Sequence, residues 1–136
     1  MNAPTAAQLR EALATRVVIA DGGMGTMLQA AGPTLEDFQG YDGCNEVLNV
    51  SRPDIVRSVH QAYVDAGCDA VETNTFGANL ANLGEYGIPE RIYELARAGA
   101  ELAREYGIAD VEGRQPPSYR DTHKVWPHQH FPNVIR

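Results

Sequence analysis

Apolar residues recur along this chain with two different spacings, which predict alternating strands and helices. Between residues 5 and 14, Leu9, Ala12 and Leu13 form one apolar stripe, as in a short helix. The run 16–20 is dominated by β-branched residues and shows no alternation. Such a run favours a strand that is buried on both faces, as in a parallel sheet.

The same order of elements then repeats. Ser51, as the expected N-cap, and Pro53 mark a helix start, so we expect a helix over 51–66. A second short strand is expected at 68–73, and apolar residues at helical spacing predict a longer helix at 90–105. Strand, loop and helix in repeated order are typical of βα units on a parallel sheet, so the predicted fold class is α/β.

The pattern ends near residue 110. Segment 110–136 is rich in proline and histidine, and no period of a strand or helix can be found in it. We therefore expect three parts: an N-terminal helix at 1–15, an α/β domain at 16–109 and an irregular tail at 110–136. A third strand is expected in this tail and is not found, and two strands cannot close a core of their own.

Charge and composition narrow the function classes. The chain of 136 residues has 11 basic and 18 acidic side chains, a net charge of −7. This charge argues against a nucleic-acid or anionic-membrane partner. No apolar run approaches the roughly 18 residues of a membrane-spanning helix. The two cysteines are too few for a disulfide scaffold and suit a reducing compartment, so the predicted location is cytoplasmic.

A first candidate site follows the first predicted strand, at Asp21, Gly22 and Gly23. A phosphate loop is disfavoured, because the Walker lysine and the third glycine of the dinucleotide fingerprint are absent. A carboxylate at a strand end suits an ammonium group, and the glycines would let a ligand approach the backbone closely. The alternative is that Asp21 only caps the following turn.

A second candidate site follows the second predicted strand. Glu72, Thr73 and Asn74 are consecutive polar residues, and Phe76 lies two positions further on. If the fold is a barrel, both strand ends lie on its catalytic face, and Glu72 is a neighbour of Asp21. The alternatives are a polar turn and, for Phe76, a place in the core.

Metal sites built from the chain's own residues are weakly supported. Cys44 and Cys68 lie 24 positions apart with no paired ligand nearby. His60 is adjacent to the apolar stripe of its helix, so we interpret it as a packing or surface residue. The histidines of the tail lack regular ligand spacing.

Three segments together resemble a known family. Segments 17–29, 43–56 and 66–79 are similar to the homocysteine-binding barrel of cobalamin-dependent methionine synthases, within the homocysteine S-methyltransferase family. These segments include the strings Asp-Gly-Gly-Met-Gly-Thr, Gly-Cys-Asn-Glu-Val-Leu-Asn and Glu-Thr-Asn-Thr-Phe. The resemblance runs from residue 16 to residue 106.

The resemblance implies the first two βα units of a (β/α)8 TIM-type barrel that binds homocysteine. It implies that Asp21 meets the homocysteine amino group, that Gly22 and Gly23 form the adjacent turn, and that Thr73, Asn74 and Phe76 belong to a substrate loop. In the intact family, zinc held by three cysteine thiolates activates the substrate sulfur. The methyl group then comes from methylcobalamin, which a methyltetrahydrofolate module recharges.

The departures from the family are equally specific. Neither Cys44 nor Cys68 matches a zinc ligand of the family, no cobalamin or folate module follows, and the tail has the composition of out-of-frame coding. The sequence thus predicts a methyltransferase fragment, an incomplete barrel that is inactive alone. The alternatives are a non-catalytic remnant or amino-acid-binding module without the zinc half-site, and a structural protein that reuses two βα units.

Overall fold

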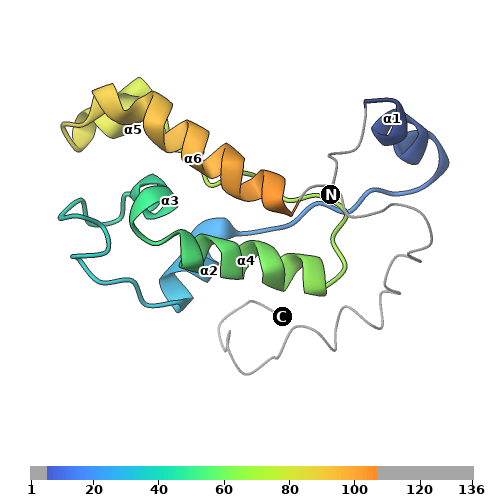
Figure 1. Cartoon of the computed structure of the whole chain (residues 1–136), viewed down its shortest axis with the longest axis horizontal. Helices are drawn as coiled ribbons and strands as arrows, with labels where there is room; N and C mark the ends of the chain where they lie inside the picture. The colour runs from blue at the N-terminus through green and yellow to red at the C-terminus, as the bar shows by residue number, and fades with distance from the viewer. Residues whose placement is uncertain (1–5, 107–136) are drawn as a thin grey trace, which may run out of the picture.

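A computed structural model describes residues 6–106, and these residues form a mainly helical body (Figure 1). Residues 1–5 and the predicted tail at 110–136 lie outside the described residues. The helices, in chain order, are α1 (Ala6–Thr15), α2 (Met24–Ala30), the 3-10 turn η1 (Asn45–Val47), α3 (Leu48–Ser51), α4 (Pro53–Asp65), α5 (Leu80–Glu85), the 3-10 turn η2 (Pro89–Arg91) and α6 (Ile92–Glu105). Within this part of the chain, no helix is both long and apolar enough to cross a membrane.

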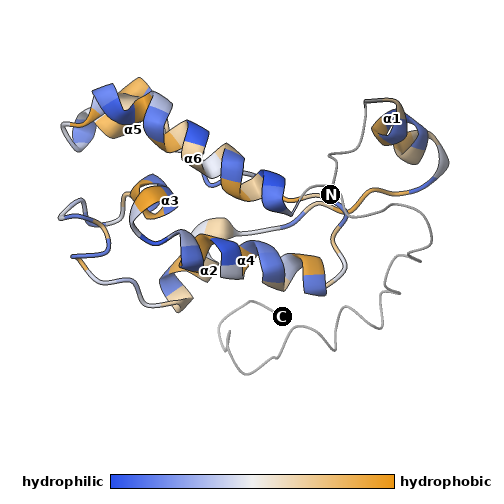
Figure 2. Ribbon diagram, viewed as in Figure 1, coloured by the Kyte–Doolittle hydropathy of each residue, from blue (hydrophilic) through white to orange (hydrophobic). Residues whose placement is uncertain are grey.

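Helix α6 contacts the two apolar clusters that form the core. One cluster joins α2, α4 and α6 and includes Leu28, Val56 and Leu102. The other joins η1, α5 and α6 and includes Leu83 and Leu95. In Figure 2, α4 and α6 carry hydrophilic and hydrophobic residues side by side, as the helical spacing of their apolar residues predicts.

The two predicted strands lie side by side but form no strand in the described residues. Their only bridge is a parallel one between Ala20 and Ala70. The Asp21 amide donates to the Ala70 carbonyl at 2.9 Å, and the Ala70 amide donates to the Ile19 carbonyl at 3.2 Å. The parallel direction was predicted correctly, whereas the extent of the strands, 16–20 and 68–73, was not.

On both sides of the bridge, the next backbone amide donates to a side-chain carboxylate, and the pairing of the two segments ends there. The Ile19 amide donates to the Asp69 carboxylate at 2.9 Å, and the Glu72 amide donates to the Asp21 carboxylate at 3.0 Å. In a longer parallel ladder these amides would donate to backbone carbonyls. The chain therefore keeps the hydrogen bonds of paired strands but replaces two of their acceptors with carboxylates.

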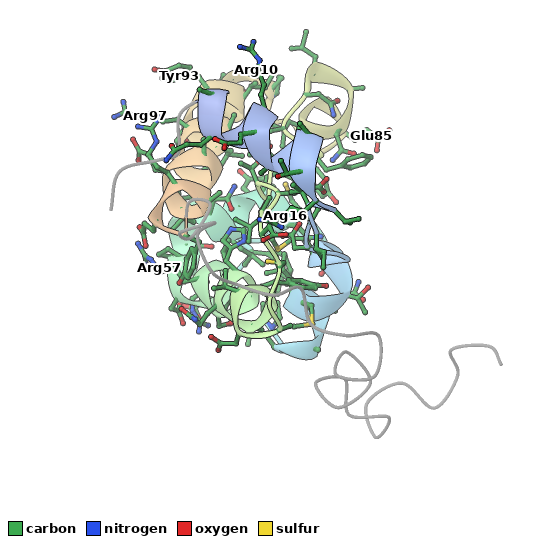
Figure 3. The ribbon with its side chains drawn as sticks, turned by 90° about the vertical axis from the view of Figure 1, so that its right-hand side faces the viewer. Arg10, Arg16, Arg57, Glu85, Tyr93 and Arg97 are labelled. Carbon is green, nitrogen blue, oxygen red and sulfur yellow. The ribbon has the colours of Figure 1, made fainter. Side chains whose placement is uncertain are left out.

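An ion pair fixes the start of the paired segments. The Arg16 guanidinium donates to both oxygens of Asp69, at 2.8 and 2.9 Å. In Figure 3, Arg16 lies near the centre of the view, whereas Tyr93 and Arg97 lie at its margin. Because the Asp69 side chain is only 10% exposed, this bidentate pair is better shielded from water than the other ion pairs of the described residues.

The predicted helices at 51–66 and 90–105 are present, with different starts. Ser51 is the last residue of α3, and its hydroxyl donates to the Val47 carbonyl at 3.0 Å. The N-cap of α4 is Arg52, so the capping role predicted for Ser51 is wrong. Gly67, with φ +94°, follows the end of α4 and provides the left-handed conformation common after a helix.

Candidate functional site

Asp21 lies where the paired segments end, and its two carboxylate oxygens have different surroundings. Oδ1 accepts the Glu72 amide at 3.0 Å. Oδ2 is buried and has no hydrogen-bond partner within residues 6–106. A buried acceptor without a partner is energetically costly, so Oδ2 is a natural position for a donor from a ligand.

The electrostatics of Asp21 agree with this geometry. Burial raises the pKa of its carboxyl above the ordinary value; the Glu72 amide opposes that shift and the Glu72 charge adds to it. A cation at Oδ2 would lower the pKa again. The alternative interpretation, that Asp21 only caps the following turn, is wrong, because Oδ1 accepts the distant Glu72 amide and Oδ2 has no partner in the described residues.

Gly22 and Gly23 connect Asp21 to α2, and neither has a positive φ. Space is nevertheless tight at position 22, because a Cβ atom there would lie 3.2 Å from the Tyr63 hydroxyl and would displace that side chain slightly. Tyr63 extends from α4 toward this turn, and its hydroxyl donates to the Gly23 carbonyl at 3.5 Å. Burial raises the pKa of Tyr63, and the Asp21 charge raises it further.

The second predicted site forms a loop beside Asp21. Glu72 and Thr73 are exposed, and the Thr73 and Thr75 hydroxyls are 2.6 Å apart. Phe76 is fully exposed, so its interpretation as a core residue is wrong. Asn74 alone among the predicted site residues is buried. The structure thus places Glu72 against Asp21 and separates the Phe76 side chain from the core.

Two site-forming residues were missing from the sequence prediction. Asn49 and Glu46 are buried, and each binds the loop that follows the second paired segment. The available signal was their spacing: two polar residues, three positions apart, among the apolar residues Val47, Leu48 and Val50. In a helical turn that spacing places both on one face.

The described residues do not fit a zinc site. No group of three or more histidine, cysteine, aspartate or glutamate side chains among them is arranged to hold a metal. Cys44 and Cys68 belong to different apolar clusters. Burial and the nearby Glu46 charge raise the pKa of the Cys44 thiol, whereas metal binding needs the thiolate.

Comparisons with known proteins agree with the sequence resemblance. The family model described as homocysteine S-methyltransferase matches residues 18–117. The methionine synthase of Mycobacterium tuberculosis (strain ATCC 25618 / H37Rv) is 53% identical over 105 residues, which are 77% of this chain and 9% of that protein. The methionine synthase of Mycobacterium leprae (strain TN) is 54% identical over 96 residues, which are 71% of this chain and 8% of that protein.

A solved structure shows the same similarity in three dimensions. The metallated form of the homocysteine methyltransferase MmuM from Escherichia coli matches with a TM-score of 0.57 and 29% sequence identity. The match covers 72% of this chain and 33% of that one. This chain therefore spans about a tenth of the mycobacterial relatives and a third of the solved structure. Since the family model covers most of its residues, the chain belongs to the homocysteine S-methyltransferase family.

Proposed function

We propose that this chain provides the amino-acid-binding part of a homocysteine S-methyltransferase of the methionine synthase type. The observation that carries the proposal is Asp21 Oδ2, which is buried without a hydrogen-bond partner in the described residues. The ammonium group of homocysteine is a cationic donor of suitable size for that oxygen. Its binding would replace an unsatisfied carboxylate oxygen with a charge-assisted hydrogen bond.

The neighbouring predicted residues have supporting roles in this proposal. Gly22 and Gly23 keep the turn beside Asp21 free of side chains, and Glu72 fixes the carboxylate through its amide. Thr73, Asn74 and Phe76 form the loop beside the bound amino acid. The domain at 16–109 would be the first two βα units of a (β/α)8 barrel, a proposal supported by the parallel Ala20–Ala70 bridge.

The chemistry at the sulfur belongs to other parts of the enzyme in this proposal. Zinc and cobalamin are implied by the family, and the described residues contain no fitting zinc ligands. We assign this chain binding and orientation of homocysteine, and we assign the methylcobalamin and methyltetrahydrofolate modules to the remainder of the enzyme. The cytoplasm stays the proposed location, because two isolated cysteines suit a reducing compartment.

The test uses a chimera in which residues 18–106 of this chain replace the matching segment of the M. tuberculosis methionine synthase. Asp21→Asn keeps the size of the side chain and removes its charge. Hydrogen bonds to charged groups contribute roughly 1.5–3 kcal/mol, so homocysteine affinity in a calorimetric titration should fall about 10- to 150-fold.

Zinc content provides the control for that titration. Asp21 is not a proposed metal ligand, so elemental analysis should find the same zinc content in the chimera and its Asp21→Asn variant. Unchanged homocysteine binding, or loss of zinc together with loss of binding, would contradict the role proposed for Asp21.

A further inference from the structure

Two buried polar side chains near the proposed site have no role in the function described so far. Glu46 is 5% exposed and Asn49 is 3% exposed. Burial of such groups is unfavourable unless hydrogen bonds compensate for the lost water. Their hydrogen bonds are therefore a guide to what they do.

Asn49 joins three segments of the chain through its amide group. Its Nδ2 donates to the Asn74 carbonyl at 2.7 Å and to the Leu95 carbonyl, in α6, at 3.1 Å. Its Oδ1 accepts from Asn74 Nδ2 at 3.0 Å. Asn74 Nδ2 also donates to the Asn45 carbonyl at 2.8 Å. The loop is thus fixed at Asn74 to both α6 and the segment that contains η1 and α3.

Glu46 fixes the same loop three residues later. Its Oε1 accepts the Gly77 amide at 2.6 Å, and its Oε2 accepts the Cys44 thiol at 3.8 Å. A Cβ atom at position 77 would lie 2.7 Å from Glu46 Oε1 and would collide with Asn82 Nδ2. Glycine at this position therefore permits the close approach of the carboxylate to the backbone.

The loop between these two anchors carries Phe76, whose ring is fully exposed. Because this ring buries no apolar surface against the described residues, it is free to contact a ligand. The loop starts at Glu72, whose amide binds Asp21. The Phe76 ring is consequently carried by a loop that is anchored at three of its own residues. Glu72 binds Asp21, Asn74 binds Asn49, and Gly77 binds Glu46.

We infer that Glu46 and Asn49 are positioning residues that hold the loop 73–77 so that Phe76 contacts the carbon chain of the bound amino acid. This inference rests on the proposed function, since it assumes that Asp21 receives the ammonium group. Anchoring the loop before the ligand arrives lowers the entropy lost on binding. Glu46 and Asn49 themselves need not touch the substrate.

Asn49→Asp in the chimera is the first test. The substitution keeps the shape of the side chain but turns the donor of two hydrogen bonds into an acceptor that faces two carbonyl oxygens. Loss of two neutral hydrogen bonds corresponds to a rise in homocysteine KM of about 10-fold. Because the lost interactions act on binding alone, kcat and zinc content should stay unchanged.

Glu46 offers a conservative pair of variants for the second test. Glu46→Gln keeps an oxygen that can accept the Gly77 amide, so its homocysteine KM should stay near that of the parent chimera. Glu46→Met has a similar length and no such acceptor, and its KM should rise like that of Asn49→Asp. If Asn49→Asp does not fold, the difference between these two variants decides the inference.

The role of Phe76 is tested by a double-mutant cycle. If the anchors act through the Phe76 ring, Asn49→Asp should have little effect on KM in a Phe76→Ala background, because the positioned group is already absent. Fully additive effects on KM would overturn the inference.

Val56→Ala is the matched structural control. Val56 is completely buried in the apolar cluster that joins α2, α4 and α6. Its truncation therefore destabilises the fold without touching the loop. Its homocysteine KM should stay unchanged. An equal rise of KM in Val56→Ala, or an unchanged KM in Asn49→Asp, would overturn the inference. A parent chimera that fails to bind homocysteine would instead overturn the proposed function.

Discussion

At the scale of single residues, Asp21 shows how a residue proposed to bind a ligand lowers the stability of the fold that carries it. A carboxylate with one buried oxygen and no partner for it in the described residues is unfavourable in the free protein. Burial raises the pKa of the group, so its contribution to stability is complete below the ordinary aspartate pKa and is lost as pH rises through the folded value. A cationic ligand bound at Oδ2 would offset the stability that the fold loses when Asp21 ionises.

Substitution by alanine should have opposite effects on stability at two helical glycines, Gly99 and Gly84. A Cβ atom on Gly99, in α6, would lie 2.7 Å from Thr75 Cγ2 and 2.8 Å from Asn49 Nδ2. Gly99→Ala should therefore lower the free energy of unfolding by about 1–3 kcal/mol, the usual cost of overpacking. Urea unfolding followed by circular dichroism measures this change.

Gly84, in α5, is the control for that substitution. No heavy atom lies within 4 Å of its would-be Cβ, and its φ is not positive. Gly84→Ala should raise the free energy of unfolding by about 0.5–1 kcal/mol, because alanine favours helix more than glycine. Equal effects of the two substitutions would contradict the close approach at Gly99.

At the scale of elements, much of the helical pattern could be predicted from the sequence, because it depends on local spacing. The apolar residues of α4 and α6 predicted both helices and their buried faces. The starts of helices and the extent of the strands could not be predicted. Asp69 and Asp21 accept backbone amides in place of carbonyls, and nothing in the runs 16–20 and 68–73 shows that exchange.

The residues of the candidate site also fall into two groups, those that could be predicted from the sequence and those that could not. Asp21 and Glu72 were predicted as neighbours from the rule that parallel strands end at one edge, and their hydrogen bond agrees. Glu46 and Asn49 were missed, because their roles depend on contacts across 25 or more positions with Asn74 and Gly77. The local pattern of apolar and polar residues gives little indication of contacts between segments so far apart in the sequence.

The paired segments should depend strongly on the Arg16–Asp69 ion pair. Asp69→Asn removes the charge that binds Arg16 and weakens the acceptor of the Ile19 amide. We expect a loss of about 1–3 kcal/mol of unfolding free energy in a urea titration, since the lost bonds are charge-assisted and largely shielded from water.

The exposed pair of Arg97 and Glu101 provides the comparison. Both side chains are more than half exposed, at 63% and 62%. Glu101→Gln should change the unfolding free energy by less than about 0.5 kcal/mol. If both variants lose equal stability, the Arg16–Asp69 pair has no special role in joining the two segments.

At the scale of the whole molecule, α6 connects the two apolar clusters, and His60, in α4, packs near the end of α6. His60 is completely buried, its ring centroid is 5.5 Å from that of Tyr106, and neither ring nitrogen has a partner in the described residues. Of the two interpretations made for it from the sequence, a packing role is confirmed and a surface position is wrong. Burial lowers the pKa of His60, while the Glu105 charge opposes that shift.

The stability of the whole chain should consequently fall in mildly acidic solution. Because the pKa of His60 is lower in the folded state, the unfolded state takes up the proton first as pH drops below about 6.5. Stability is then lost at up to about 1.4 kcal/mol per pH unit. Urea titrations between pH 7 and pH 5 measure this slope.

His60→Leu isolates the contribution of this one group. The variant places an apolar, non-titrating side chain at this buried position and should show a smaller loss of stability over the same pH range. The carboxylates of Asp21 and Asp37 are present in both proteins, so their titration cancels in the difference between the two slopes. Identical slopes for the parent and the variant would show that His60 does not control the acid sensitivity.

The anchoring of the loop 73–77 also has a consequence for evolution. The atoms that hold the loop belong to the backbone of Asn74 and Gly77 and to the side-chain amide of Asn74. Thr73 and Phe76 are exposed and contribute nothing to these bonds, so their side chains can be exchanged while the loop keeps its course. In the proposed function, such a separation would let substrate preference diverge among descendants of one ancestor without a new fold, and it marks positions 73 and 76 as the first targets for library design.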